Sequence, residues 1–273
     1  MNLLNAIINI NNQKTLTVKD FYKSRNRVNN MGEALELFIY DAFAGTLDNT
    51  NAQQVNEIYS RTFSYLGNQN NPPDAIIKNG DALEIKKIES KGSSLALNSS
   101  YPKHKLYSSS PMITKACKNC EQWIEKDIIY SVGVVNDNQI KSLAFVYGED
   151  YAASPEIYER IKNTIKTGIE SIADVEFGET NELGRVNRVD PLGITYLRIR
   201  GMWGIENPFT VFKYIKEAPF FAIINSEKYY TFPLNSRNIV ENCNGIRIKS
   251  CKIKNPDNPA LTKDAVLITF REK

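Results

Sequence analysis

Hydrophobic residues recur at helical spacing in several parts of the chain. In residues 31–43, MGEALELFIYDAF, one helical face collects Leu35, Phe38, Ile39, Ala42 and Phe43. Residues 155–172 repeat isoleucine at every fourth position, and the N-terminal residues MNLLNAIINI show helical spacing as well. We predict an amphipathic helix in each of these segments, the N-terminal one short, and a further helix over residues 114–125.

Runs of apolar and β-branched residues predict the strands. The turn sequence Asn79-Gly80-Asp81 separates residues 75–78 from residues 82–89 and predicts a β-hairpin. Further strands are expected over residues 128–135, 142–147, 194–200, 220–225, 228–232, 245–254 and 265–270. This order predicts an α/β fold, with a mixed β-sheet flanked by helices and a β-rich C-terminal part. Because no repeat or linker divides the chain, we expect a single domain spanning residues 1–273.

The composition is that of an ordinary globular protein. Hydrophobic residues make up 42% of the 273 residues, charged residues 24%, and the formal net charge is +3. That small positive excess fits a nucleic-acid partner without indicating one. No run reaches the ~18 apolar residues of a membrane span, and the N-terminus lacks a basic flank and a cleavage site. We therefore expect a cytoplasmic protein with no membrane contact.

Several kinds of chemistry have no support in the sequence. His104 is the only histidine, and no nucleophile motif accompanies it, which argues against a Ser–His or Cys–His triad. Phosphate-binding glycine motifs of nucleotide and dinucleotide enzymes do not occur. Cys117 and Cys120 form a CxxC, but Cys243 and Cys251 are spaced too widely for a zinc knuckle. Reduced cysteines, the first two one turn apart on a helix, are the better interpretation.

The predicted hairpin carries the residues that indicate chemistry. Asp74 precedes its first strand, and Glu84 and Lys86 lie on its second. Two carboxylates on adjacent strands can bind Mg²⁺, a hard cation that neutralises charge during phosphodiester hydrolysis. Lys86 shares a strand face with Glu84, because side chains alternate with period two, and its ammonium could orient water or stabilise developing charge.

The register of the hairpin decides whether these side chains meet. A two-residue turn would set Asp74 opposite Ile85, on the wrong face. We predict a three-residue loop, Asn79 to Asp81 with Gly80 at positive φ, which sets Asp74 opposite Lys86 and diagonal to Glu84. On its own the short motif is weak, since a solvated hairpin with an ordinary charged face fits the same letters.

The surrounding sequence is more specific. The pattern Pro73-Asp74-x9-Glu84-Ile85-Lys86 is that of the PD-(D/E)xK nucleases. The longer segments around it, which include "FSYLGNQNNPPDAIIKNGDALEIKKIESKG" and "NELGRVNRVDPLGITYLRIRGMWGIENP", resemble the NgoPII-type restriction endonucleases. The resemblance runs over nearly the whole chain. It implies a restriction-endonuclease-like core, with the catalytic part at about residues 25–150 and DNA recognition at about residues 175–255.

The resemblance also implies roles for individual residues. Asp74 and Glu84 would bind Mg²⁺, together with the backbone carbonyl of Ile85, and Lys86 would be the catalytic lysine. Related nucleases often add a glutamate from a helix, and Glu36 matches by position. Helical geometry agrees, because Glu36 falls at the edge of the apolar stripe whereas Glu33 lies nearly opposite it.

Two segments are candidates for DNA contact. Residues 90–105 are basic and rich in hydroxyl groups, which suits phosphate binding, although a solvated loop has the same composition. The candidates there are Lys91, Asn98, Ser99, Ser100, Lys103 and His104. Residues 181–207 combine arginines with aromatic residues, and arginine is the residue that bridges guanine O6 and N7. The candidates there are Arg185, Asn187, Arg188, Tyr196, Arg198, Arg200 and Trp203.

The expected function is that of a type II restriction endonuclease. The resemblance implies Mg²⁺-dependent hydrolysis of double-stranded DNA at a short palindromic GC-rich site, GGCC, with a cognate DNA methyltransferase in the same system. A palindrome implies a homodimer, because protein symmetry mirrors site symmetry. The alternatives are a structure-specific repair or recombination nuclease on the same core, and a DNA-binding protein that has lost cleavage.

Overall fold

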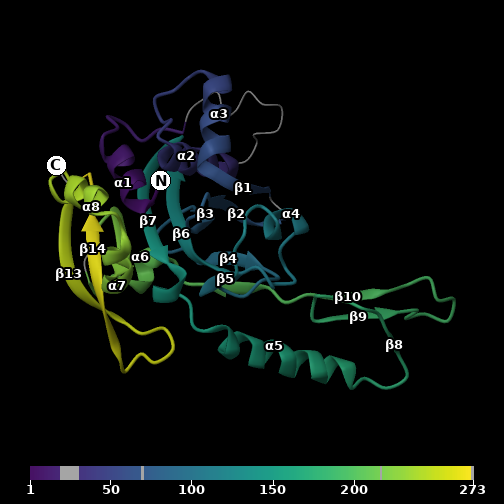
Figure 1. Ribbon diagram of the computed structural model, residues 1–273. Coiled ribbons are helices and arrows are strands. Elements are labelled where there is room, and N and C mark those ends of the chain that lie inside the picture. The colour runs from purple at the N-terminus through teal and green to yellow at the C-terminus, as the bar shows by residue number, and fades with distance from the viewer. Residues whose placement is uncertain (19–30, 69–70, 216, 272–273) are drawn as a thin grey trace.

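A mixed β-sheet forms the centre of the computed structural model, which describes residues 1–18, 31–68, 71–215 and 217–271 (Figure 1). Within these residues the main sheet has the strand order β1-β2-β3-β6-β7-β12-β14-β13, and β5 pairs with β6. The β3–β6 and β7–β12 pairs are parallel and the other pairs antiparallel. The strands are β1 (Phe63–Asn68), β2 (Asn71–Ile77), β3 (Ala82–Ile88), β5 (Lys105–Tyr107), β6 (Glu125–Asn136), β7 (Gln139–Tyr147), β12 (Phe220–Asn225), β13 (Arg247–Lys254) and β14 (Thr262–Thr269).

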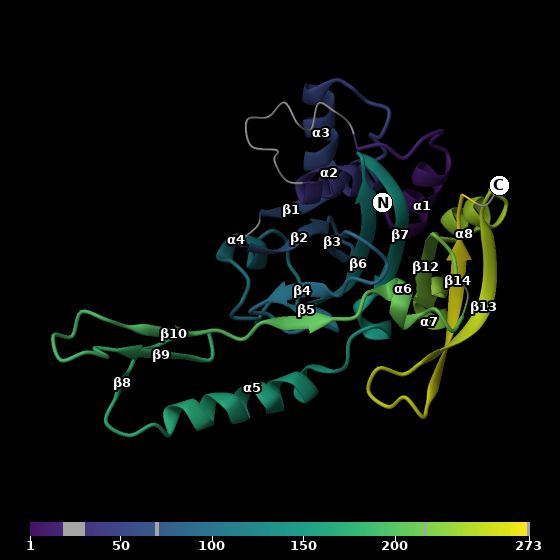
Figure 2. The same ribbon diagram turned by 180° about the vertical axis from the view of Figure 1, so that it is seen from behind.

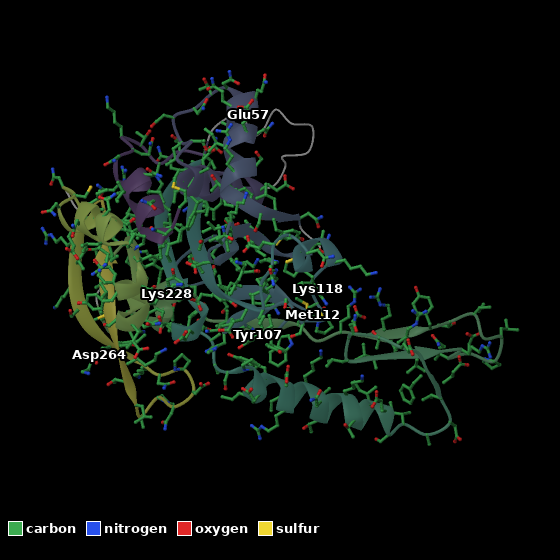
Figure 3. All side chains as sticks on the ribbon, viewed as in Figure 1. Glu57, Tyr107, Met112, Lys118, Lys228 and Asp264 are labelled. Atoms are coloured by element: carbon green, nitrogen blue, oxygen red, sulfur yellow. The ribbon has the colours of Figure 1, made fainter. Side chains whose placement is uncertain are left out.

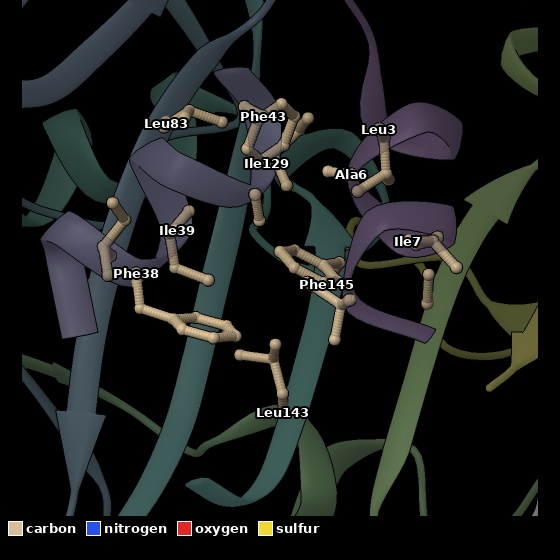
Figure 4. Packing of buried hydrophobic residues seen from close by; sticks show 14 of the residues in the cluster. Leu3, Ala6, Ile7, Phe38, Ile39, Phe43, Leu83, Ile129, Leu143 and Phe145 are labelled. Atoms are coloured by element: carbon tan, nitrogen blue, oxygen red, sulfur yellow. The ribbon is translucent and has the colours of Figure 1, made fainter. Parts of the chain in front are cut away.

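Both faces of this sheet are covered, so the mixed α/β fold expected from the sequence is confirmed. One face packs against α1 (Leu3–Asn11) and α2 (Met31–Ala44), in a core that includes Phe43 and Phe145 (Figure 4). The other face packs against α4 (Lys115–Lys118), α6 (Pro208–Val211) and the strand β4 (Leu95–Asn98). The other helices described in the body are α3 (Ala52–Thr62), α7 (Ser226–Thr231), α8 (Leu234–Glu241) and the 3-10 helix η2 (Gly148–Asp150).

An arm projects from this body, as both views of the molecule show (Figures 1 and 2). It consists of α5 (Pro155–Glu170) and a small sheet of β8 (Glu176–Phe177), β9 (Gly184–Asn187) and β10 (Leu197–Ile199), and it returns to the body through β11 (Trp203–Ile205), which pairs with β4. No described residue of α5 is buried, although its isoleucines follow the predicted spacing. At the base of the arm, Tyr101 stacks on Tyr158 with ring centres 5.3 Å apart, and Trp203 meets both rings edge-on.

The hairpin that carries the motif has the predicted loop length but a different position. Ile76 pairs with Ala82, and the Ile77 amide donates to the carbonyl of Asp81, so the loop is residues 78–80 instead of 79–81. The left-handed residue is Asn79, at φ 55°, and not Gly80, because asparagine also tolerates this conformation. Because the closing pair moves by one position on each strand, the same side chains still point to the same face of the hairpin. Continuing this register sets Asp74 opposite Glu84.

Close backbone packing holds β2 in this position. At Gly67 in β1, a Cβ atom would overlap the carbonyl oxygens of Asn71 and Pro73, so no larger residue fits there. Asp74 therefore follows directly on a segment that is pressed against the neighbouring strand.

Other local predictions are wrong as well. The strand expected over residues 194–200 is confined to residues 197–199. Of residues 228–232, expected as a strand, residues 228–231 belong to α7 and Phe232 follows as its C-cap, because the Asn225 side chain accepts from the Lys228 amide and caps the start of the helix. The helix expected over residues 114–125 is confined to α4, since Glu121 instead pairs with Lys126 and accepts from the Asn79 amide. Cys117 lies on that short helix and Cys120 lies beyond it, and all four cysteines are free.

None of the helices in the described part of the chain is long and apolar enough to span a membrane.

Candidate active site

The side chains of Asp74, Glu84 and Lys86 converge on one face of the β2–β3 hairpin. The Lys86 Nζ atom lies 2.6 Å from Glu84 Oε1 and 3.8 Å from Asp74 Oδ2. The Ile85 amide donates to Asp74 Oδ2 over 2.5 Å, and the Tyr40 hydroxyl donates to the Asp74 carbonyl over 2.7 Å. The hairpin thus brings together the three residues that the short motif singled out.

Burial and mutual charge perturb these groups. The side chains of Asp74, Glu84 and Lys86 are only 13%, 15% and 25% exposed. Burial has the largest effect on the pKa of Asp74 and the nearby Glu84 carboxylate the next largest, and together they raise it to about 8. Lys86 and the hydrogen bond from the Ile85 amide act in the opposite direction. Burial by itself would lower the pKa of Lys86, but the two carboxylates outweigh it and raise that pKa. The Lys86 ammonium is therefore firmly charged beside the two carboxyl groups.

Glu36 shares this electrostatic environment. It lies half-buried on α2, and burial raises its pKa while Lys86 opposes the rise and Glu33 and Glu84 add to it. The electrostatic influence of Lys86 and Glu84 on Glu36 is what we expect if Glu36 faces the hairpin. Its catalytic role stays a prediction.

The donor set of the hairpin consists of carboxylate oxygens, the ligand type that hard divalent cations prefer. Among the described residues, no group of three or more histidine, cysteine, aspartate or glutamate side chains is arranged to hold a metal. Asp74 and Glu84 offer two carboxylates, and a backbone carbonyl such as that of Ile85 and water could complete the shell. Mg²⁺ is typically bound in this way, through one or two carboxylates with several retained waters.

A cleft of about 720 Å³ joins this centre to the base of the arm. Its walls include Asp74, Glu84 and Lys86 from the hairpin and Met112, labelled in Figure 3, from the body. Of the predicted DNA-contact residues, the described lining includes Ser99, Ser100, Lys103, Arg198 and Arg200. The cleft therefore unites the candidate cutting centre with part of both candidate DNA-binding segments.

The other predicted DNA-contact residues lie elsewhere in the described structure. On the arm, the Arg185 guanidinium lies 5.0 Å from the centre of the Tyr196 ring, and its Nε atom donates to Asn187 Oδ1. Arg188 forms an ion pair with Glu176. Trp203 belongs to the aromatic cluster at the base of the arm.

On the body, the Lys91 ammonium lies over the Phe209 ring, and the buried Nδ1 atom of His104 has no hydrogen-bond partner among the described residues. Asn98 ends β4, and its side chain lies outside the described part of the structure. That these residues contact DNA remains a prediction.

Sequence reasoning missed several residues that line the cleft. Tyr101, Tyr130 and Glu182 are among them. Tyr130 could have been found from strand pairing, because the parallel register sets it beside Glu84. Glu182 lies in the arginine-rich segment, but no local pattern distinguishes it from the neighbouring glutamates.

Comparison with known proteins shows the family to which the chain belongs. The sequence profile of the NgoPII restriction endonuclease family matches residues 1–255. The chain is 51% identical, over 99% of its own length and 99% of the relative, to the type II restriction enzyme NgoPII of Neisseria gonorrhoeae. No solved structure matches the chain. With a family profile that covers most of the chain and a relative that matches nearly all of it, the protein belongs to the NgoPII restriction endonuclease family.

Proposed function

We propose that this protein is a type II restriction endonuclease that hydrolyses both strands of double-stranded DNA at a short palindromic site. The observation that carries the proposal is the convergence of Asp74, Glu84 and Lys86 in a cleft that also holds Arg198 and Arg200. The family relationship supports the same reaction. The site we expect is GGCC, from the resemblance to the NgoPII-type enzymes.

The cofactor we propose is Mg²⁺, held by Asp74 and Glu84 with help from the Ile85 carbonyl. When bound, Mg²⁺ would neutralise charge at the scissile phosphate and make nearby water more acidic. The protein supplies the rest. Lys86, kept charged by its neighbours, is placed to orient the attacking water or to stabilise the charge that develops on the phosphate.

Glu36 and Lys103 complete the proposed reaction site. Glu36 carries a raised pKa, so it can take up and release a proton close to Lys86. Lys103 is a cleft cation whose backbone amide donates to the Tyr130 hydroxyl over 2.6 Å. Its ammonium, together with Ser99 and Ser100, is suited to hold the DNA backbone in register with the hairpin.

The proposed assembly follows from the target. A two-fold symmetric site is matched by a homodimer, each subunit cutting one strand. We also propose a cytoplasmic location, where a cognate methyltransferase would protect the host DNA.

The decisive experiment is digestion of plasmid DNA of known sequence with the purified protein, in Mg²⁺ and in EDTA, with mapping of the ends. Discrete Mg²⁺-dependent fragments that end at one palindrome are expected. Cutting of flaps or single strands without a sequence pattern would instead indicate a repair nuclease. Binding without any cleavage would indicate a protein that has lost the reaction, and either result would overturn the proposal.

A further inference from the structure

Glu182 ties together the two arginines of the cleft. Its Oε2 atom accepts from Arg198 Nε over 3.1 Å, and its Oε1 atom accepts from Arg198 Nη2 over 2.7 Å. The same Oε1 atom lies 2.6 Å from Arg200 Nε. All three side chains line the cleft that contains the candidate cutting centre.

The carboxylate is well enclosed although the arginines are not. The Glu182 side chain is 14% exposed, whereas those of Arg198 and Arg200 are 47% and 54% exposed. The Glu182 amide also donates to the hydroxyl of Thr180 over 3.1 Å, which fixes its backbone. Burial raises the pKa of Glu182, but the hydrogen bonds and charges of Arg198 and Arg200 together outweigh it and lower that pKa, so the carboxylate remains ionised.

A negative charge in a cleft for DNA has an electrostatic cost. Phosphate binding gains affinity from lysine and arginine, and a carboxylate on the same wall opposes that gain. The enclosed position of Glu182 is explained if it acts on the arginines and not on the DNA. A bidentate carboxylate contact fixes the plane of a guanidinium group, as it does with Arg198.

We propose that Glu182 is a positioning residue that sets the sequence specificity of cleavage by fixing Arg198 and Arg200 for contact with guanine. This inference rests on the proposed function. The contacts among the described residues use two of the five N–H donors of Arg198 and one of those of Arg200. The remaining donors belong to side chains that line the cleft, where the edge of a bound guanine would present O6 and N7 as acceptors.

Ordering the two arginine side chains in advance reduces the conformational entropy that is lost when DNA binds. A free arginine side chain loses much rotamer freedom when it docks on a base, and this loss weakens specific binding. Glu182 orders both guanidinium groups before DNA arrives. Contacts with the correct base pair therefore gain affinity, while non-specific contacts with phosphates gain nothing from the fixed orientation.

The test compares Glu182→Gln with the wild type and with Glu179→Gln as matched control. Glu179 is an exposed neighbour in the same segment, so its substitution removes the same charge without touching the arginine pair. The probes are a duplex that contains the palindrome cut by the wild type, and the same duplex with one G·C pair of the site changed to A·T. The measurements are Kd for both duplexes in EDTA, and kcat and KM for the first duplex in Mg²⁺.

For Glu182→Gln we expect the ratio of the two Kd values to fall at least about tenfold, since one good bidentate base contact discriminates by roughly that factor or more. Binding to the altered duplex should stay unchanged or tighten. On the cognate duplex KM should rise while kcat holds, because Glu182 makes no contact with Asp74, Glu84 or Lys86 among the described interactions. Glu179→Gln should match the wild type.

Two further variants make the result decisive. In an Arg198→Ala, Arg200→Ala background, Glu182→Gln should change discrimination no further, because its effect passes through the arginines. If Glu182→Gln melts well below the wild type, Glu182→Asp makes the same comparison, since it keeps the charge but is too short to span both partners. A Glu182 variant that folds and keeps full discrimination overturns the inference while leaving the proposed function intact. A wild type that does not discriminate between the duplexes overturns both.

Discussion

Replacing Asp74 by asparagine should abolish cleavage and, unusually for a buried residue, stabilise the metal-free protein at alkaline pH. The Asp74 carboxyl is 13% exposed and lies beside the Glu84 carboxylate, and together burial and this neighbour raise its pKa to about 8. A carboxyl group whose pKa is higher in the folded than in the unfolded protein binds its proton more tightly when folded. The free energy of unfolding therefore falls as pH rises from about 4 to about 8.

The size of this effect can be bounded from the structure. A rise in pKa from 3.8 to about 8 corresponds to at most ~6 kcal/mol at 1.36 kcal/mol per unit. Asparagine keeps an oxygen that can accept from the Ile85 amide but loses the attraction to Lys86, 3.8 Å away, so only part of the bound is recovered. We expect a gain of about 2 kcal/mol at pH 8, or about 4 °C in Tm.

Urea or thermal unfolding in EDTA at pH 8 and pH 5 measures this difference. The gain should shrink markedly at pH 5, where the wild-type carboxyl is already protonated. Asp264→Asn serves as control, because that side chain is 71% exposed in an ion pair with Lys252 and should shift stability little at either pH. An Asp74→Asn protein that is equally or less stable than the wild type at pH 8 would refute the reasoning.

Other variants test separate parts of the molecule. Lys86→Met should lower kcat at least about a hundredfold, as expected for loss of one charge-stabilising donor, while gel-shift binding persists; undiminished single-turnover cleavage would remove Lys86 from the site. Glu36→Gln should slow cleavage and flatten its dependence on pH, and a pH–rate profile identical to the wild type would exclude a proton-transfer role. Lys103→Ala should weaken DNA binding to all sequences alike. It should also reduce the slope of log Kd against log salt concentration by about one, as binding titrations at several salt concentrations would show. Phe145→Ala, in the fully buried core, should cost about 3–5 kcal/mol of stability in urea unfolding, and a loss below 1 kcal/mol would contradict the packing described.

Local patterns predicted the part of the fold that local interactions determine. Helix α2 and strand β12 have the expected bounds to within a residue, because burial of one face dictates the spacing of their apolar residues. The turn sequence also predicted the hairpin and its three-residue loop length, which sets the Asp74 and Glu84 side chains on the same face. Its loop began one residue earlier than expected because asparagine, and not glycine, took the left-handed position.

Long-range contacts account for what the sequence could not predict. Residues 228–232 have a strand-like composition, yet Lys228 reaches Asp81 and Asp127 from a helix, and both partners are more than 100 residues away in the chain. The position of the arm was equally inaccessible. Alternation in residues 195–200 correctly set Arg198 and Arg200 on one side, as their shared partner Glu182 shows, but could not reveal that they face the hairpin across a cleft.

The separation of arm and body bears on how enzymes of this kind could change their target. The hairpin with Asp74 and Glu84 is built into the central sheet, whereas Arg198 and Arg200 lie on a projecting segment that is joined to the body through an aromatic cluster and the β4–β11 pair. Substitutions at the arm can accumulate without disturbing the packing beneath the hairpin. If the proposed roles hold, a lineage could acquire a new recognition sequence while its cutting chemistry stays the same, and grafting an arm between relatives would be the natural route to engineer one.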